Sequence, residues 1–444
     1  IWIATEGDGL LRLDPETGGI KTYTHTEGAK NSITSNYVRT ISSDIYGRLW
    51  IGTFNGLDII EDGNISNFKS DPFTIGSLSQ PSVRCIMKDN QGGMWLGTWF
   101  GGINYWHPQK NRFRNIQRSI HGDSLNDNIV SCIAEDTDNT LWIGTKSGGL
   151  NHYYPETGLF KYYSLMKNPH NERIESNDIK AIHIDEEGRR IYFGAHAGGV
   201  NILDKESGNI LNCDYGKPGD TPLDVYAIIA AEDGYLWVGT LSGLKKFDKR
   251  SMTFEDIDKD CNGKPLRNLR IKYLLMDSSN RLWIGGEKGL ECMEITDKGL
   301  RPYQPKILEA TRTSAFVNCI YESSSKLMWI ATSNGMLCYD ERENQLIKYN
   351  TSNGLPSNMI HGIEEDSFGR IWMSTDNGLC CFNPFSGGFR NFSIHDGIQS
   401  NQFNTYSHCR QSNGNMLFGG ICGITVFRPE SMKDNTFSPQ PQIT

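Results

Sequence analysis

The residues that most often perform catalysis are present in this chain of 444 residues, but they do not form a catalytic pattern. Three carboxylates stand together at Glu364, Glu365 and Asp366, and paired carboxyl groups can act as a general acid and a general base. They lie at a turn that recurs along the chain, so we interpret them as parts of that turn. No serine–histidine–aspartate signature, phosphate-binding loop or HExxH motif occurs. The sequence predicts no catalytic residue and no cofactor.

Cysteine and histidine are numerous but scattered. The chain has 11 cysteines, an odd number, without a CxxC pair, and its 10 histidines lack the spacing of metal ligands. We therefore predict neither a metal site nor a redox-active pair.

Aromatic side chains in one loop are candidates for binding a sugar. Trp99 and Phe100 lie in the segment WLGTWFGGINYW, and Trp106 follows at its end. Aromatic side chains offer a large, flat apolar face, on which a sugar ring can stack. We predict that these three residues bind an oligosaccharide, with ordinary packing at the rim of the fold as the alternative.

Polar and charged side chains in the equivalent loops of other repeats are further candidates. These loops differ from one repeat to the next while the surrounding pattern stays the same, so the fold leaves their side chains free for recognition. The basic ones could contact a uronate or a sulfate, although scattered solvated charge is the alternative. The predicted ligand-binding residues in these loops are Lys146, His196, Lys288, Asn334 and Asp376.

A sequence repeat positions all of these candidates. It centres on a segment such as LWIGT at residues 49–53, with an aromatic residue at its second position. Ten copies occur, 43 to 50 residues apart, and Tyr192 and Leu417 replace tryptophan in two of them. The aromatic position falls at residues 2, 50, 95, 142, 192, 237, 283, 329, 372 and 417.

Each repeat contains four segments of strand length. In one copy these are VRTI (38–41), RLWIGT (48–53), LDII (57–60) and ISNF (65–68), separated by turns that contain Gly, Asp or Asn. Four strands in a unit of this length are typical of a β-propeller blade. We predict an all-β propeller fold of four-stranded antiparallel blades, with the tryptophans packed between neighbouring blades.

The third position of the first segment is mostly small. The first strand of a blade lines the central channel, where strands crowd together, and cysteine behaves there as a small hydrophobic residue. We predict that these thiols are structural. Tyr273 and His408 break the pattern, which otherwise comprises Thr40, Cys85, Cys132, Ala181, Ala227, Cys319 and Gly362.

Two classes of loop are expected at one end of such a ring. These are the loops that enter the first strand and the loops that join the second strand to the third. We predict that ligands bind at this end, around the mouth of the channel. Asparagine recurs in the entry loops, where local Asx turns explain it better than ligand binding does, at Asn128, Asn177, Asn358 and Asn401.

The composition excludes several classes of protein. The net charge is −8 and no basic face or tail is evident, which argues against a nucleic-acid partner. No apolar run approaches the 18 residues of a membrane span, so we predict no direct membrane insertion. The chain starts at Ile1 without an initiator methionine, and we expect it to be part of a longer protein.

The repeats resemble those of two-component regulator propellers, which form the periplasmic sensor region of hybrid two-component histidine kinases in Bacteroidetes. The resemblance rests on the pattern D-x-x-G-x-[LIM]-W-[IVLM]-[GAS]-T-x-x-G-[LIM], which is nearly intact at residues 44–57 and 366–379. The segment GLPSNMIHGI at 354–363 is similar to the family's entry to the first strand. Essentially the whole chain is covered.

Members of this family usually carry fourteen such units in two seven-bladed propellers, followed by an immunoglobulin-like domain. The resemblance therefore implies that residues 1–120 are the last three blades of one propeller and that residues 121–440 are a complete seven-bladed propeller. Residues 441–444 would begin the linker to the next domain. A single ring of ten blades is the alternative.

The resemblance also implies a function. It points to the periplasmic sensor portion of an inner-membrane histidine kinase, which binds a glycan-derived oligosaccharide and regulates polysaccharide-utilisation genes. It implies a homodimer in the full-length receptor. The alternatives are a propeller-fold glycan lyase or hydrolase, and a scaffold for protein interactions.

Overall fold

The computed structural model confirms the predicted all-β fold. It describes residues 1–432 except 30, 75, 109–111, 121–122, 166–173, 214–222, 233, 269 and 313–315, so the predicted linker at 441–444 lies outside the described residues. In the described part the only α-helix is α1 (Ile307–Thr311). No helix of that part is long and apolar enough to span a membrane. The same part of the chain contains the 3-10 turns η2 (Thr351–Asn353), η3 (Ile394–Asp396) and η4 (Pro429–Ser431).

The chain divides into two compact units. Unit 1 comprises Ile1–Arg112 and Ser119–His121, and unit 2 comprises Phe113–Arg118 and Gly122–Lys433. The strands of each unit pair only in antiparallel fashion within the described residues, as short turns between successive strands dictate.

Six sheets of unit 2 each contain four strands that are consecutive in the sequence. The first three sheets are β12 (Val130–Glu135), β13 (Leu141–Thr145), β14 (Leu150–Tyr154) and β15 (Leu159–Tyr163); β16 (Ile179–Ile184), β17 (Arg190–Ala195), β18 (Val200–Asp204) and β19 (Ile210–Cys213); and β20 (Val225–Ala230), β21 (Tyr235–Thr240), β22 (Gly243–Asp248) and β23 (Thr253–Ile257). The next three are β24 (Ile271–Met276), β25 (Arg281–Gly286), β26 (Gly289–Thr296) and β27 (Gly299–Tyr303); β28 (Val317–Glu322), β29 (Met328–Thr332), β30 (Gly335–Asp340) and β31 (Gln345–Tyr349); and β32 (Ile360–Glu365), β33 (Ile371–Thr375), β34 (Gly378–Asn383) and β35 (Gly388–Phe392).

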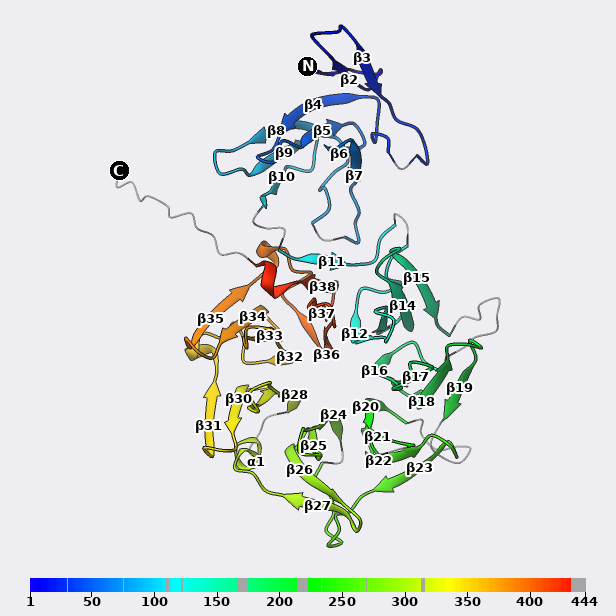
Figure 1. Cartoon of the computed structure of the whole chain (residues 1–444), viewed down its shortest axis with the longest axis vertical. Helices are drawn as coiled ribbons and strands as arrows, with labels where there is room; N and C mark the ends of the chain where they lie inside the picture. The colour runs from blue at the N-terminus through cyan, green and yellow to red at the C-terminus, as the bar shows by residue number, and fades with distance from the viewer. Residues whose placement is uncertain are drawn as a thin grey trace. The chain divides into compact units, whose positions relative to one another are not determined.

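The seventh sheet of unit 2 joins the two ends of the unit. Its inner strands are β36 (Phe403–Arg410), β37 (Met416–Gly420) and β38 (Gly423–Phe427), and its outer strand is β11 (Arg114–Ile116), which pairs with β38. The strand β11 lies before residue 120, where the sequence analysis places the end of the first propeller. Across the closure, the Asn404 side chain donates to the Val130 carbonyl at 2.8 Å. Figure 1 shows the seven sheets around a common centre, with the first strand of each innermost.

Unit 1 contains three sheets. One has four strands, β4 (Val38–Ser43), β5 (Leu49–Thr53), β6 (Gly56–Glu61) and β7 (Asn64–Phe68). The other two have three strands each within the described residues: β1 (Trp2–Ala4), β2 (Leu10–Leu13) and β3 (Ile20–Tyr23), and β8 (Val83–Lys88), β9 (Met94–Thr98) and β10 (Ile103–Trp106).

The repeated tryptophan packs between sheets, as predicted. Trp329 of β29, for example, belongs to a buried cluster with Ile360 and Ile371 of the next sheet. The tryptophans at 50, 142, 237, 283, 329 and 372 are at most 4% exposed. Trp2 and Trp95 are the exceptions: Trp2 is half-buried and Trp95 is 38% exposed. Within the described residues, unit 1 has no further sheet after that of β9 against which Trp95 could pack.

The aspartate of the repeated turn holds this tryptophan in place. Asp366 Oδ1 accepts the backbone N–H groups of Phe368 and Arg370, and its Oδ2 accepts the Trp372 indole N–H at 2.9 Å. The same bond from indole to aspartate recurs at Trp50, Trp95, Trp142 and Trp283. The conserved spacing between aspartate and tryptophan in the repeat therefore has a structural cause.

Two repeats that keep the tryptophan lack this aspartate and show its effect. Ser323 stands six residues before Trp329, and Ala231 six before Trp237, and neither buried indole N–H has a hydrogen-bond partner. Both tryptophans remain buried all the same. Packing therefore places the indole, and the aspartate adds the hydrogen bond that keeps it from being unsatisfied.

We expect the Asp366→Ala variant to lower the free energy of unfolding by about 2 kcal/mol, since the Trp372 indole N–H and two backbone N–H groups of a buried turn would lose their acceptor. Ser323→Ala should cost well under half of that, because Trp329 has no partner there to lose. Urea unfolding of both variants measures the difference. Equal losses would show that the aspartate is not the acceptor that matters.

Candidate functional site

A β-bulge at the start of each first strand singles out one side chain per blade. In β16 the register passes from Ile179 opposite Ala195 to Ala181 opposite Gly194, so Lys180 has no partner across the ladder. The same shift occurs in the first strands of seven other sheets, namely β4, β8, β12, β20, β24, β28 and β32. Bulges re-aim side chains and are common beside binding sites. In unit 2 the residues at this position, which we call the bulge ring, are Ser131, Lys180, Tyr226, Lys272, Asn318 and His361, with Asn404 in the longer bulge of β36.

The loops between second and third strands lie beside the bulge ring. The His196 backbone N–H donates to the Asp178 carbonyl at 2.8 Å, and the Lys146 N–H donates to the Ile129 carbonyl at 2.9 Å. The two loop classes therefore share one end of unit 2, as the sequence analysis expected. We call this end the mouth.

The structure brings five of the predicted residues to the mouth. Side chains in equivalent loops of five sheets are exposed there. Two of them contact first strands, since His196 Nδ1 lies 2.7 Å from Asp224 Oδ1 and Asp376 Oδ1 lies 2.8 Å from His361 Nε2. The five are Lys146, His196, Lys288, Asn334 and Asp376.

The three predicted aromatic residues belong to unit 1 and do not form one site. Trp99 follows the end of β9, whereas Trp106 pairs across the ladder with Met94 at the start of β9, at the opposite end of the sheet. Trp106 packs on Trp50, with ring centroids 5.1 Å apart. Its position matches the packing alternative, while Trp99 and Phe100 are 43% and 85% exposed.

Part of the bulge ring serves the fold itself. The Asn318 side chain donates to the Ile360 carbonyl at 2.8 Å, and the Ser131 hydroxyl donates to the Ile179 carbonyl. Each bond, like that of Asn404, joins one first strand to the next around the ring. The side chains of the bulge ring for which no such bond to the next first-strand backbone is seen among the described residues are Lys180, Tyr226, Lys272 and His361.

Those four side chains of the bulge ring differ in their electrostatic surroundings. Lys180 is paired with Asp178 at 2.7 Å, and His361 lies between Asp376 and the Thr405 hydroxyl, 3.0 Å away. The Lys272 ammonium lies over the Tyr226 ring, 5.3 Å from its centroid, and has no carboxylate at ion-pair distance within the described residues. Lys272 and Tyr226 therefore present a charge and an aromatic face together.

Tyr406 closes the centre of the ring next to this pair. It sits in the long bulge of β36 with a left-handed φ of 67°, a conformation that is strained for a tyrosine. Its ring lies 6.3 Å from Tyr226 and 6.1 Å from Tyr273, which belong to strands on the other side of the ring. The Tyr406 hydroxyl is buried without a hydrogen-bond partner. Sequence analysis missed Tyr406 because two extra residues in β36 take it out of the repeat alignment.

Deeper in the ring, His408 does not occupy the third position of its strand, where the sequence analysis placed it. It lies opposite Phe418, as Ile363 lies opposite Met373, which is one position further along the first strand. It fits there because a neighbouring residue is small. A Cβ on Gly362 would lie 2.4 Å from the His408 ring, so the imidazole occupies the space that this glycine leaves. His408 Nδ1 contacts Glu364 Oε1 at 2.9 Å, and Nε2 lies 3.6 Å from Cys319 Sγ. Burial opposes protonation of His408, but the Cys319 sulfur and the Glu364 carboxylate outweigh it and raise the pKa to about 10.

Two cysteines of the channel are buried, which fits the structural role predicted for them. Burial raises the pKa of Cys132 to about 12, so its thiol stays protonated at neutral pH. Cys132 and Cys319 are at most 4% exposed, whereas Cys85 in unit 1 is exposed. The adjacent carboxylates are structural too, because Glu365 accepts hydrogen bonds from the Ser324 backbone and hydroxyl at 2.7 and 2.8 Å.

The asparagines of the entry loops are structural, but they do not form local Asx turns. Asn358 Oδ1 accepts the backbone N–H of Thr351 at 2.9 Å, and the Asn358 carbonyl accepts from Gly335 at 2.8 Å. The side chain thus holds together the connection between β31 and β32, and the backbone carbonyl bonds it to β30 of the preceding sheet. Equivalent side-chain bonds occur at Asn128, Asn177 and Asn401.

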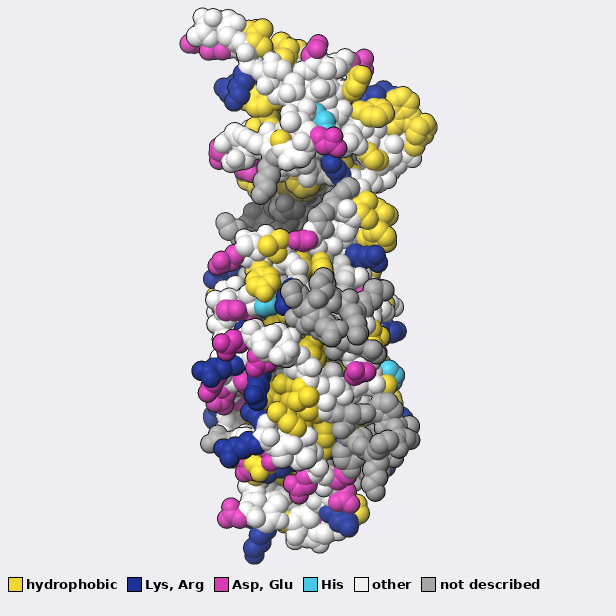
Figure 2. Space-filling model, turned by 90° about the vertical axis from the view of Figure 1, so that its right-hand side faces the viewer, with side chains coloured by type: hydrophobic (Ala, Val, Ile, Leu, Met, Phe, Trp, Pro, Cys, Tyr) yellow, Lys and Arg dark blue, Asp and Glu magenta, His cyan; other side chains and the backbone are white. Residues whose placement is uncertain are grey.

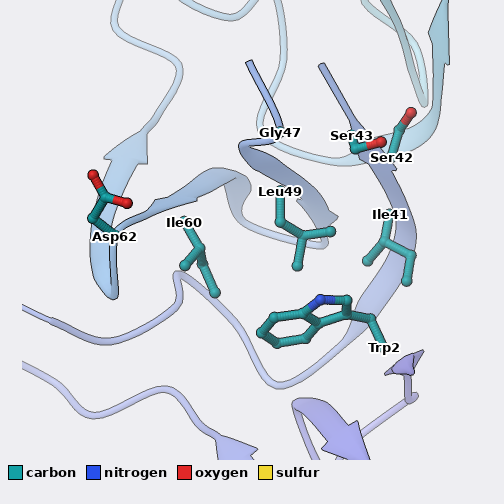
Figure 3. A pocket seen from close by; sticks show the side chains of 8 residues that line it. All are labelled: Trp2, Ile41, Ser42, Ser43, Gly47, Leu49, Ile60 and Asp62. Carbon is teal, nitrogen blue, oxygen red and sulfur yellow. The ribbon is translucent and has the colours of Figure 1, made fainter. Parts of the chain in front are cut away.

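Two pockets elsewhere offer less chemistry. In unit 1 a cavity of about 530 Å³ lies between the first two sheets, and Figure 3 shows Trp2 lying below Leu49 and Ile60 in it. In unit 2 a groove of about 490 Å³ runs along outer strands and holds both carboxylates and lysines. Within the described residues no group of three or more His, Cys, Asp or Glu side chains could hold a metal ion.

Comparison with known proteins shows which family of repeats these segments match. Residues 32–55, 77–100, 124–147 and 354–377 match the family described as two component regulator propeller. The chain contains two-component regulator propeller repeats. Each matched segment runs from an entry loop through the bulge to the loop after the second strand, so the repeat signature covers the parts that build the mouth.

Solved structures agree with this assignment of two-component regulator propeller repeats. The extracellular domain of a hybrid two-component system from B. thetaiotaomicron is 25% identical, with a TM-score of 0.67, over 97% of this chain and 60% of that domain. A second extracellular domain from the same organism, 21% identical with a TM-score of 0.60 over 99% of this chain and 58% of that one, shares the fold.

A curated relative points the same way. Histidine kinase P4 of Formosa agariphila is 24% identical over 226 residues, which is 50% of this chain and 16% of that protein. The chain therefore spans a minor part of the kinase it matches. Taken together, the likenesses support a sensory extracellular domain.

Proposed function

We propose that this chain belongs to the periplasmic sensor region of a hybrid two-component histidine kinase and that the mouth of unit 2 binds an oligosaccharide released from a glycan. The observation that carries the proposal is the bulge ring, which presents one polar side chain from each blade at one end of the ring. The likeness to the extracellular domain from B. thetaiotaomicron supports the sensory role.

The mouth suits a polyhydroxylated ligand. Sugar hydroxyl groups need donors and acceptors spread over a surface together with an apolar face for the ring, and binding sites commonly combine the two. Lys272 and Lys288 supply donors, Asn334 supplies both kinds of group, and Tyr226 supplies an aromatic face. Tyr406 forms the floor.

Signalling requires that the ligand favour one of two states of the receptor. We propose that the receptor is a homodimer in which ligand binding shifts the arrangement of propellers or subunits, and that the kinase responds by altering expression of polysaccharide-utilisation genes. A ligand that bound both states equally would transmit nothing.

The test is a thermal-shift screen of the purified chain against a panel of glycan-derived oligosaccharides, followed by calorimetry with Lys272→Met. We expect a hit that stabilises the chain, and a loss of affinity of about tenfold or more in the variant, which removes a charge-assisted hydrogen bond. Lys246→Met is the matched control, because Lys246 also lies over a tyrosine ring, at 4.2 Å from that of Tyr235. Tyr235 begins β21, at the end of that sheet opposite the mouth.

Two outcomes would contradict the proposal. If the Lys272 and Lys246 variants bound the oligosaccharide with equal affinity, the binding site would not be at the mouth. Conversion of the oligosaccharide into products by the purified chain would favour a glycan lyase or hydrolase over a sensor.

A further inference from the structure

Unit 1 carries its own arrangement of bulge residues, and both are arginines. Arg39 occupies the bulge of β4 and Arg84 that of β8, in adjacent sheets. The Arg84 guanidinium carbon lies 3.3 Å from the centroid of the Trp99 ring, and that of Arg39 lies 5.4 Å from it. Two cations from neighbouring blades therefore converge on one indole.

The loops of the same two sheets surround the arginines with aromatic side chains. The Phe54 ring lies 5.4 Å from the Arg39 guanidinium and 6.4 Å from the Tyr37 ring, and Phe100 lies 5.7 Å from Trp99. All four aromatic residues are between 43% and 85% exposed. Figure 2 shows hydrophobic side chains gathered on the surface of unit 1, in the upper part of the view.

The positive charge of this cluster is not neutralised by the protein. Neither arginine has a carboxylate at ion-pair distance within the described residues, and the buried Nε of Arg39 has no hydrogen-bond partner. Desolvation and the charge of Arg39 lower the pKa of Arg84, against a weaker opposite effect from Glu6. Like charges placed together, with a buried donor unsatisfied, favour an anionic group at this position.

The geometry selects a particular kind of anion. A guanidinium stacked on an aromatic ring keeps its N–H edge free, and that edge fits a carboxylate or sulfate with two parallel hydrogen bonds. The exposed faces of Trp99, Phe100 and Phe54 beside it are apolar and flat, so the anionic group should be attached to a body with an apolar face. A pyranose ring that bears an acidic group has both features.

We propose that Arg39, Arg84 and Trp99 form a binding site on unit 1 for an acidic saccharide, with the arginines on the carboxylate or sulfate and the aromatic residues on the sugar ring. This site is independent of the mouth of unit 2, because the residues that form it all belong to unit 1. According to this proposal, Trp99 and Phe100 bind an anionic sugar, whereas the sequence analysis predicted only that they bind an oligosaccharide.

The test is calorimetry of the full chain with three probes: trigalacturonate, a sulfated disaccharide and neutral maltotriose. We expect trigalacturonate, the sulfated disaccharide or both to bind and maltotriose to bind at least tenfold more weakly. Arg84→Gln should weaken the acidic probe about tenfold or more, and raising the salt concentration should weaken it further. Arg84→Lys should recover only part of the loss, because lysine keeps the charge without the planar fork.

Arg12→Gln is the matched control, since Arg12 of β2 also stands over a tryptophan of unit 1, 5.5 Å from the Trp2 ring, without a second arginine beside it. The inference is overturned if neither acidic probe binds at millimolar concentration, if maltotriose binds equally well, or if the Arg12 and Arg84 variants lose the same affinity. Lys272→Met should leave this binding unchanged, so failure here is distinguishable from failure at the mouth.

Discussion

Replacing Trp372 by alanine is expected to lower the free energy of unfolding by about 3–5 kcal/mol, the usual cost of emptying a large buried aromatic site. Trp372 is 1% exposed and lies in a cluster with Phe392 and Phe427 of neighbouring strands. Its removal would leave a cavity between two sheets and would take from Asp366 Oδ2 one of its two hydrogen-bond donors. Chemical denaturation followed by circular dichroism measures the loss.

Two other aromatic residues serve as controls for this prediction. Phe385 of unit 2 is 87% exposed, so Phe385→Ala should change stability by less than about 0.5 kcal/mol. Trp95 has the same place in the repeat as Trp372 but is 38% exposed, so Trp95→Ala should have a smaller effect on unit 1 than Trp372→Ala has on unit 2. A loss for Trp372→Ala no larger than that for Phe385→Ala would refute the packing role of the indole.

Breaking the pair between His408 and Glu364 is expected to be about as costly. The side chains of His408 and Glu364 are 8% and 12% exposed, and removing one member of a buried ion pair typically costs about 3–5 kcal/mol, because the other charge stays buried without a partner. Glu364→Ala should therefore destabilise unit 2 by this amount at pH 7. Glu61→Ala, at a solvent-exposed position of unit 1 (60% exposed), is a control of matched chemistry.

The same pair predicts a pH dependence with a definite sign. The pKa of His408 is about 10 in the folded chain and 6.5 as an unperturbed imidazole. A raised pKa in the folded state means that protonation stabilises the fold below pH 6.5 and that this contribution is lost as the pH rises towards 10. Urea unfolding of the wild type and of Glu364→Gln at pH 6, 8 and 9.5 should show a steeper fall for the wild type. Parallel curves would mean that His408 does not carry the proton.

Much of the fold could be predicted from the sequence because the same strand and turn pattern occurs in ten copies. The positions of the tryptophans fix the strand order, and the Asp-to-Trp spacing fixes one turn of each blade. Figure 1 shows one consequence that the repeat does not contain, the use of β11 as the outer strand of the last sheet. That pairing joins segments about 300 residues apart in the sequence, and a repeat carries no information about which chain end supplies the closing strand.

The candidate site was predictable only in part. The loop side chains Lys146 and His196 could be found because they vary against a constant background. The same alignment contains the bulge position, which lies one residue before the small third position. The residues at that position in successive repeats include Lys180, Tyr226 and Lys272, and this run of polar side chains was the signal that was missed. Nothing in the alignment marks Tyr406, because its conformation depends on an insertion in a single strand.

The most direct test of the central claim, that the bulge ring and its neighbouring loops form a ligand site, is hydrogen–deuterium exchange with the oligosaccharide that the screen identifies. The account predicts slower exchange at the starts of the first strands and in the loops after the second strands, in peptides that contain Lys180, Tyr226, Lys272, His361 and Tyr406. Slower exchange confined to outer strands such as β15, β23 and β31, with the mouth unchanged, would contradict it.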